Sequence, residues 1–353
     1  MKKMKRLYSL CISVLMVCNL CAVVPAAAEP APELIGTKLD ARSYTEMPLE
    51  SGNRDMEKLN DGTMDGAVVV SLSKDVDMSD GSYYVDIVCN GYEATFQSLD
   101  LGCNEGLVDT QGIKKIGIAA YDDAAQTWPA GPAETHDITW PKSGGAYTGK
   151  TVVHLNTPVT SSRLRVYILD ANREWDNFRM EELAAYGELT GNRVESLAKH
   201  AAVTANFECD GGKPLSSLTD QDFATEMLTN FEATAENPGI ITMDFGESYY
   251  EFESMDMAGL FSTDAGVTAM TIEYKKDGAW TKLKDETFNR SGRYGTTNSQ
   301  IDRIALGVTT NGLRFKITDY VKSWGHFRIS ELALYGKAGD SPDPGPDPEP
   351  VKS

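Results

Sequence analysis

"FRISELALYG" (residues 327–336) stands just before the chain turns into proline and aspartate, and "FRMEELAAYG" (178–187) precedes it by 149 positions. The similarity extends upstream without a gap, because residues 164–187 and 313–336 are identical at 12 of 24 positions. A match of this length between two parts of one chain indicates an internal duplication whose copies both end in this segment.

Two shorter matches extend the duplication toward the N-terminus. "LDLG" (99–102) resembles "MDFG" (243–246), and "AYDDAAQTW" (120–128) resembles "EYKKDGAW" (273–280). A period of about 150 residues is the size of a whole domain rather than of a solenoid repeat. The sequence therefore predicts two tandem copies of one domain.

The residue pattern within each copy is typical of antiparallel β-structure. Apolar and polar residues alternate in "LRVYIL" (164–169) and in "LRFKIT" (313–318), as in strands with one buried face. "AMTIEYKKDGAWTKL" (269–283) indicates a strand, a turn and a second strand. Many short strands separated by turn signals predict an all-β fold with two tandem jelly-roll sandwiches.

The closing segment of each copy changes the parity of its apolar residues. Phe327 and Ile329 share one parity, whereas Leu332 and Leu334 share the other, and the first copy does the same around Glu182. A change of parity requires an extra residue, so we expect a β-bulge or bend near Glu331 and near its counterpart.

The first copy also contains more residues between two of the matched positions. Asp61 and Asp100 are 39 positions apart, whereas Asp220 and Asp244 are 24 apart. The additional residues include several tyrosines within 72–92. We expect an extra hairpin here, at the edge of the sandwich or as a second contact surface.

The two ends of the chain differ from the domains. Residues 1–28 combine a basic start, an apolar run and small residues for cleavage, as in a secretory signal peptide. We therefore expect secretion or display on a bacterial cell surface, with domains at 33–188 and 193–337. The Pro/Asp-rich segment 338–353 is expected to be an extended tail, typical of a truncated chain or a surface tether.

The charge of the chain restricts its partners. The formal net charge of −19 becomes about −23 without the four basic residues of the signal peptide. This charge repels nucleic acid, anionic lipid and sulfated or sialylated glycans at long range, so a neutral partner or a cation is favoured. Solubility outside the cell explains the charge equally well. We expect no nucleic acid partner, no membrane insertion and a monomer.

Three cysteines follow the signal peptide, namely Cys89, Cys103 and Cys209. Cys89 and Cys103 are candidates for a disulfide in an oxidising compartment, which leaves Cys209 unpaired. Buried free thiols are the alternative.

The matched segments resemble the coagulation factor V/VIII type C, or discoidin-like, domains, and most of all the bacterial family 32 carbohydrate-binding modules. The resemblance is carried by the closing "EELAAYG" and "SELALYG", by "LDLG" and "MDFG", by the "DGAW" hairpin and by an early Asp-containing loop. It implies an eight-stranded jelly roll of the galactose-binding-like type.

The resemblance also implies a structural calcium ion between the early loop and the glutamate of the closing strand. Calcium prefers several hard oxygen ligands, which such a loop supplies. Gln221 stands where the family usually has glycine, and a solvated loop with a hydrogen-bonded glutamate is the alternative. The residues implied are Asp61, Thr63, Asp65 and Glu182 in the first copy, and Asp220, Asp222, Thr225 and Glu331 in the second.

In the family, sugar binds on loops at one end of the sandwich, by aromatic stacking and polar contacts. The candidates in this sequence are Trp128, His136, Trp140, Arg173 and Asn177 in the first copy, and Asn289, Arg293, Tyr294 and His326 in the second. Trp175 and Trp324 occupy matching positions, as do Trp128 and Trp280 at the hairpin. Matching positions favour structural packing, so we expect both pairs to be packed into their domains.

The motifs of common enzymes are missing from this sequence. There is no H-E-x-x-H, no G-x-S-x-G and no glycine-rich phosphate loop, and 52 acidic residues supply carboxylate pairs without specificity. We therefore expect a non-catalytic, secreted adhesion protein that binds neutral glycans or glycoproteins through tandem modules. The alternative is a structural or protein-binding module of a bacterial surface protein without a glycan site.

Overall fold

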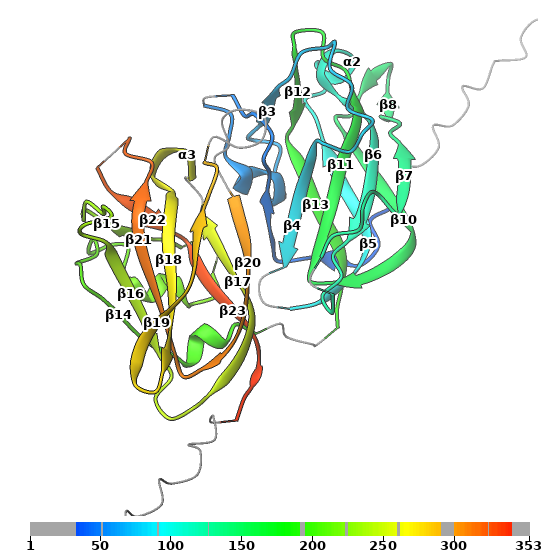
Figure 1. Cartoon of the computed structure of the whole chain (residues 1–353). Coiled ribbons are helices and arrows are strands. Elements are labelled where there is room, and N and C mark those ends of the chain that lie inside the picture. Colours follow the sequence, from blue (N-terminus) through cyan, green and yellow to red (C-terminus); the bar gives the residue numbers. More distant parts are fainter. Residues whose placement is uncertain are drawn as a thin grey trace, which may run out of the picture.

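The computed structural model describes residues 33–340 except 51, 90–91, 126, 191–194, 223–224, 260–261, 291–299 and 324. The expected signal peptide and most of the expected tail lie outside the described residues. The described chain forms two antiparallel β-sandwiches, which confirms the all-β prediction (Figure 1). In this part of the chain, no helix has the length and apolar character needed to span a membrane.

The first sandwich contains a five-stranded sheet in the order β2-β4-β11-β6-β7 and a four-stranded sheet in the order β1-β13-β5-β10. Two short ribbons, β12-β3 and β8-β9, extend from it. Its elements are β1 (Thr37–Lys38), β2 (Ala41–Tyr44), η1 (Met56–Asn60), β3 (Val68–Ser71), β4 (Tyr84–Cys89), β5 (Ala94–Gly102), α2 (Val108–Gln111), β6 (Ile113–Ala120), β7 (Glu134–Asp137), β8 (Lys142–Ser143), β9 (Ala146–Tyr147), β10 (Lys150–Ser161), β11 (Arg163–Ala171), β12 (Asn177–Met180) and β13 (Glu182–Leu189).

The second sandwich repeats this plan with sheets β14-β16-β21-β18-β19 and β20-β17-β23 and the ribbon β15-β22. Its elements are η2 (Leu197–His200), β14 (Ala202–Ala205), η3 (Leu215–Leu218), β15 (Met227–Thr229), β16 (Gly239–Asp244), β17 (Tyr250–Gly259), α3 (Ser262–Ala265), β18 (Val267–Lys276), β19 (Ala279–Thr287), β20 (Gln300–Thr310), β21 (Gly312–Tyr320), β22 (Phe327–Ile329) and β23 (Glu331–Ala338).

Each sandwich has its own apolar core, built from alternate residues of both sheets. In β11, Leu164, Val166 and Ile168 are fully buried, as the period of two predicts. In the other sheet of each copy, Phe96 of β5 and Phe252 of β17 are also fully buried. Burial of side chains of this size contributes about 1.5–3 kcal/mol each, so each copy has a core of its own to stabilise it.

The predicted bend in the closing segment is confirmed, and it is a change of sheet. β12 pairs with β3 and ends at Met180, whereas β13 begins at Glu182 and pairs with β5. β22 and β23 repeat the change on either side of Ser330. The parity of the apolar residues changes because the two halves of the segment belong to different sheets.

Strand pairing corrects one part of the internal alignment. Glu182 lies opposite Gly102 of β5, and Glu331 lies opposite Ala258 of β17. The counterpart of "FQSLDLG" (96–102) is therefore "FESMDMA" (252–258), and the match of "LDLG" with "MDFG" is wrong. "MDFG" begins at the end of β16, which occupies the place of β4.

The corrected alignment removes the expected insert. With Asp256 as the counterpart of Asp100, the spacing from Asp220 is 36 positions, against 39 from Asp61 in the first copy. The expectation of an extra hairpin within 72–92 is wrong, because β4 is an inner strand of the five-stranded sheet.

The cysteines do not form a disulfide, since Cys89, Cys103 and Cys209 are all free. Cys89 ends β4, whereas Cys103 follows the far end of β5, a strand of nine residues. At about 3.3 Å per residue, the two ends of such a strand are about 30 Å apart, well beyond disulfide reach.

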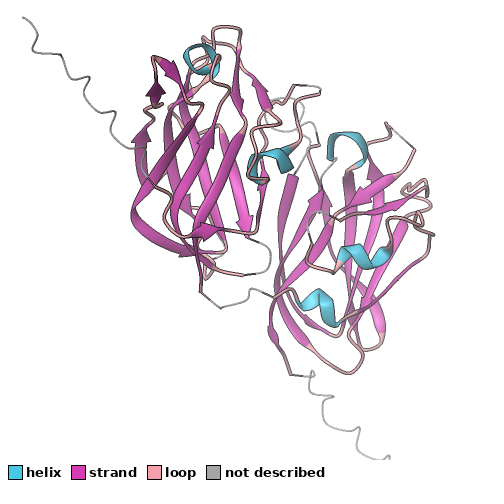
Figure 2. Cartoon of the chain, turned by 180° about the vertical axis from the view of Figure 1, so that it is seen from behind, coloured by secondary structure: helices cyan, strands magenta, loops and turns pink. Residues whose placement is uncertain are grey.

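The two sandwiches contact each other along their sides (Figures 1 and 2). Tyr44 and Val88 of the first copy form an apolar cluster with Ala258 and Ile301 of the second. Among the described residues, three ion pairs cross the contact, each with the arginine in the first copy and the aspartate in the second: Arg42–Asp222 at 3.8 Å, Arg54–Asp264 at 3.0 Å, and the buried pair Arg163–Asp256.

Candidate functional site

The most exposed tryptophan of the described chain is Trp175, in the loop between β11 and β12 at the end of the first sandwich that carries α2 (Figure 1). Its side chain is 58% exposed. The expectation that Trp175 packs into the domain is therefore wrong, and its counterpart Trp324 lies outside the described residues. An exposed indole in a loop is a candidate binding platform.

Backbone hydrogen bonds hold this loop in place on both sides. The amide of Glu174 donates to Thr110 O at 3.0 Å, and the amide of Leu72 donates to Asp176 O at 2.9 Å. Asp176 has a φ of 55° and its Oδ1 accepts from the amide of Lys74 at 2.9 Å. These contacts fix the position of Trp175 before any ligand arrives.

Arg173 and Asn177 flank the indole but are occupied by contacts within the protein. The Arg173 guanidinium donates to the carbonyls of Ser73 at 2.7 Å and Val76 at 2.8 Å. Asn177 donates to Glu50 Oε1 at 3.0 Å and accepts from Gln111. The two residues predicted as ligand contacts therefore position the loops around Trp175.

Trp140 and His136 are also turned toward the protein. Trp140 packs against the core, and its Nε1 donates to Ile113 O at 2.8 Å. His136 lies on the edge strand β7, where its Nε2 is 3.2 Å from Glu134 Oε1. Neither side chain joins Trp175 in a common platform.

Trp128 and Trp280 occupy matching positions, as expected, but neither is buried in a core. Each is half-buried and lies beneath an arginine of the five-stranded sheet of its own copy. The guanidinium of Arg165 lies 4.2 Å from the Trp128 ring centroid, and that of Arg314 lies 4.0 Å from the Trp280 centroid. The prediction of core packing is wrong, because the cation–π contact keeps both rings at the surface.

In the second copy, two of the four predicted sugar contacts are described. Asn289 is exposed, and its carbonyl accepts from Gln300 Nε2 at 3.1 Å. His326 accepts from Arg328 Nε at 3.3 Å. Arg293 and Tyr294 lie outside the described residues, so the structure describes only these two members of that set.

The acidic residues predicted to bind calcium in the second copy lie together. Thr225 Oγ1 donates to Asp220 Oδ2 at 2.9 Å, and the Asp222 amide donates to Asp220 Oδ1 at 2.8 Å. Glu331 is completely buried beside them, and its Oε2 accepts from the Gln221 amide at 3.2 Å.

Glu331 has the electrostatic properties of a cation ligand. Its Oε1 is buried and has no hydrogen-bond partner among the described residues. Burial first, and then the nearby Asp220, raise the pKa of Glu331 to about 9. A bound cation supplies both the missing partner and the charge that lowers this pKa, so these residues fit a hard divalent ion such as calcium.

The first copy has a related but less complete arrangement. Asp61 Oδ1 accepts from the amide and the hydroxyl of Thr63, each at 2.8 Å. Glu182 is buried, neither of its oxygens has a hydrogen-bond partner among the described residues, and burial followed by Asp100 raises its pKa to about 7. The side chain of Asp65 is exposed.

Two lysines lie beside the first loop. Lys58 Nζ is 3.4 Å from Asp61 Oδ2, and Lys38 Nζ donates to Asn60 O at 2.7 Å. In the described part of the chain, no group of three or more His, Cys, Asp and Glu residues has the arrangement of a metal site. Any calcium at either loop therefore depends on backbone and hydroxyl oxygens in addition to the carboxylates.

The sequence contains a signal for the exposure of Trp175 that the internal repeat obscures. Glu174 and Asp176 flank the indole and are exposed themselves. A large aromatic between two charged residues in a loop is typical of a surface position, whereas the match with Trp324 suggested packing.

Comparisons with known proteins give structural similarity without sequence matches. No family model matches the chain, and no curated protein matches it. Similar solved structures include the family 32 carbohydrate-binding module of C. perfringens NanJ in complex with galactose, at 17% identity and a TM-score of 0.33, over 40% of this chain and 98% of that one.

Two further structures cover both sandwiches. The CBM32-1 and CBM32-2 domains of Clostridium perfringens ZmpB match at 10% identity and a TM-score of 0.34, over 84% of this chain and 92% of theirs. The same pair has also been solved with GalNAc. The F-lectin from Morone saxatilis (striped bass) serum matches at 12% identity and a TM-score of 0.33, over 85% and 97%. The two β-sandwiches of this chain are established by its own strand pairing and not by these similarities.

Proposed function

We propose that this chain is a secreted, non-catalytic carbohydrate-binding protein in which the indole of Trp175 stacks on a neutral sugar ring. The exposed indole on a loop held from both sides is the observation that carries the proposal. Sugars present apolar CH faces to aromatic rings, and a ring fixed in advance loses little conformational entropy when it binds.

The surroundings of Trp175 favour a neutral sugar over an acidic one. Glu174 and Asp176 adjoin the indole, and Asp75, Asp77 and Asp109 are exposed on the neighbouring segments. Carboxylates accept hydrogen bonds from sugar hydroxyls but repel sulfate and carboxylate groups. Galactose and GalNAc, which two of the similar structures contain, are therefore the first ligands to test.

A titration of the purified full-length secreted chain with neutral oligosaccharides that end in galactose or GalNAc tests the proposal. We expect Trp175→Ala to weaken binding at least about tenfold while the melting temperature stays unchanged, because the indole is exposed. Leu189→Ala is the matched control, because Leu189 is as exposed as Trp175 and lies at the C-terminal end of β13, outside the loop of Trp175. Equal binding by Trp175→Ala, or no binding of any neutral glycan, would contradict the proposal.

We also infer that Asp220, Asp222, Thr225 and Glu331 bind a structural calcium ion. The support is the buried Oε1 of Glu331, which has no partner among the described residues. Calcium that binds only the folded state raises its melting temperature by linkage, so chelation should lower the melting temperature by several degrees. Asp220→Ala should abolish this difference, and an unchanged melting temperature on chelation of the original protein would exclude the site.

A further inference from the structure

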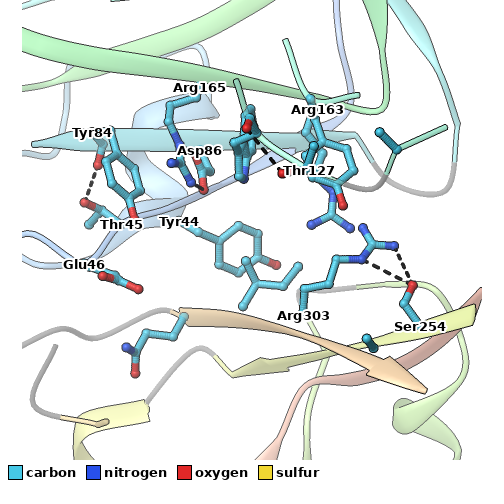
Figure 3. A pocket seen from close by; sticks show the side chains of 16 residues that line it. Tyr44, Thr45, Glu46, Tyr84, Asp86, Thr127, Arg163, Arg165, Ser254 and Arg303 are labelled. Atoms are coloured by element: carbon cyan, nitrogen blue, oxygen red, sulfur yellow. Dashed lines mark hydrogen bonds and ion pairs between the residues drawn. The ribbon is translucent and has the colours of Figure 1, made fainter. Parts of the chain in front are cut away.

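A cavity of about 530 Å³ lies between the two sandwiches and is lined by both of them (Figure 3). It opens on the outer face of the first copy's five-stranded sheet, away from the loop of Trp175. The second copy contributes residues of β17 and β20 to its wall. This volume suits a ligand the size of a mono- or disaccharide.

One part of the wall is a neutral stack of aromatic rings and an arginine. Arg165 forms a two-bond ion pair with Asp86, at 2.6 and 2.8 Å. Its guanidinium lies 3.6 Å from the centroid of Tyr84 and 4.2 Å from that of Trp128. The paired charges cancel, and Tyr84 and Trp128 both line the cavity.

A neighbouring part of the wall carries two arginines. Figure 3 shows Arg163 and Arg303 with their guanidinium groups turned toward each other, one from each sandwich. They share a single carboxylate, Asp256, which pairs with Arg163 directly and lies 3.5 Å from Arg303 Nε. Two guanidinium groups and the carboxylate of Asp256 meet at this end, and the carboxylate of Asp123 also lies near Tyr121.

Three buried polar atoms at this end have no hydrogen-bond partner among the described residues. They are two donors, the hydroxyl of Tyr121 and the Nε of Arg163, and one acceptor, the Oδ1 of Asp256. Tyr121 lies beside both arginines, whose guanidinium groups are 4.9 and 5.3 Å from its ring centroid. Buried donors without a partner are costly, so their presence on a cavity wall indicates a ligand or water that accepts from them.

Two acidic residues line the cavity: Asp86, which pairs with Arg165, and Glu46, which lies away from these donors. In Figure 3, Glu46 is on the left, beyond Tyr44, whereas Arg163 and Arg303 are together on the right. The cavity is therefore polarised, with two arginines and the Tyr121 hydroxyl at one end and Glu46 at the other. A ligand with an anionic group at one end and hydroxyl groups elsewhere complements this arrangement.

We propose that this cavity binds a carboxylate-bearing sugar, such as a uronic acid residue of an acidic glycan. The carboxylate accepts from Arg163, Arg303 and Tyr121, the pyranose ring contacts the aromatic wall, and hydroxyl groups reach Glu46. The net charge of −19 opposes approach of an acidic glycan only at long range, where salt screens it, whereas the charge within the cavity acts at contact distance. The site is separate from Trp175 and joins the two domains.

The test is calorimetric titration of the full-length secreted chain with disaccharides of galacturonic, glucuronic and mannuronic acid. Their carboxyl-reduced analogues serve as neutral controls of the same shape. We expect at least one acid to bind at least about tenfold more tightly than its reduced analogue, with an affinity that falls as salt is added. Failure of all three acids to bind, or equal affinity for acid and reduced forms, overturns the proposal.

Tyr121→Phe assigns the binding to this cavity. The hydroxyl has no partner within the described protein, so its removal should leave the melting temperature unchanged and weaken acid binding about three- to tenfold. Arg303→Gln should abolish the preference for the acid. Trp175→Ala should leave acid binding intact, which separates this site from the proposed neutral-glycan site. Unchanged acid binding in Tyr121→Phe and Arg303→Gln overturns the assignment.

Discussion

Gln221 shows how one residue differs between the two calcium-type loops. Gly62 and Gln221 occupy the same place, and both are left-handed, with φ of 82° and 61°. Glycine adopts this conformation without steric cost, whereas a residue with a Cβ pays about 1–2 kcal/mol. The second loop therefore carries backbone strain that the first does not.

Gln221→Gly should stabilise the second domain by about 0.5–1 kcal/mol, because the relief of strain exceeds the extra chain entropy of glycine. Only the backbone amide of Gln221 contacts Glu331, so this hydrogen bond is retained. Denaturant unfolding measures the effect, with Gly62→Gln as the reverse substitution in the first copy. A loss of stability in Gln221→Gly would show that the side chain contributes more than the strain costs.

Glu331 determines how the metal-free protein responds to pH. Its pKa in the folded chain is about 9, whereas an unfolded glutamate titrates near 4.5. The folded state therefore binds the proton more tightly, and this contribution to stability is fully present below pH 4.5 and is lost as pH rises toward 9. In chelator, the protein should be more stable at pH 5 than at pH 8.

Glu331→Gln should remove this difference, because the amide is neutral at both values. The variant should be more stable than the original at pH 8 in chelator, by an amount on the order of a few kcal/mol. It should also lose any stabilisation by calcium. Thermal unfolding at both pH values, with and without calcium, measures these effects, and a pH profile identical to that of the original protein would refute the assignment.

The pairing of the closing strand explains why both copies have a glycine at the same point, Gly187 and Gly336. Gly187 and Gly336 lie where β13 and β23 shift register against β5 and β17. A Cβ on Gly187 would be 2.0 Å from Thr95 O, and a Cβ on Gly336 would be 2.0 Å from Glu251 O. The close approach of two backbones leaves no room for any side chain.

Gly187→Ala should destabilise the first domain by about 1–3 kcal/mol, because backbone atoms of β5 must move to admit the methyl group. Gly131→Ala is the matched control in the same domain, since a Cβ there meets nothing within 4 Å. Denaturant unfolding compares the two variants. Equal stability of the two would mean that the strands can separate at this point without cost.

The sequence predicts the element types better than their equivalence. Alternation and the repeated closing segment are sufficient to predict two β-sandwiches and a bend next to a glutamate in each copy. Alternation alone does not identify a strand's partner, so "LDLG" was matched to "MDFG" instead of to "MDMA" (255–258) in β17. Matching positions in the two copies likewise do not say whether a side chain is covered, so the packing predicted for Trp128 and Trp175 from their counterparts is wrong.

One position of the duplicated domain has a different role in each copy, and in the second copy this role concerns the whole molecule. In the first copy, Oδ2 of Asp100 lies 3.8 Å from Nζ of Lys150 in the neighbouring strand β10. Its counterpart Asp256 is completely buried and pairs with Arg163 across the domain contact. The duplication thus supplied a carboxylate that in the second copy joins the two sandwiches.

Asp256→Ala should separate the two sandwiches. The substitution leaves Arg163 buried without its carboxylate, and loss of one partner of a buried ion pair costs about 3–5 kcal/mol. This loss falls on the domain contact, since each sandwich retains its own core. We expect small-angle scattering to show a larger radius of gyration and calorimetry to resolve two unfolding transitions.

Asp264→Ala is the control for this prediction, because its pair with Arg54 also crosses the contact but is partly exposed. Such pairs contribute about 0–1 kcal/mol, so the scattering curve should resemble that of the original protein. If Asp256→Ala also keeps the original curve, the apolar cluster around Tyr44 and Ala258 holds the sandwiches together without the ion pair. Apolar packing would then determine the shape of the cavity between them.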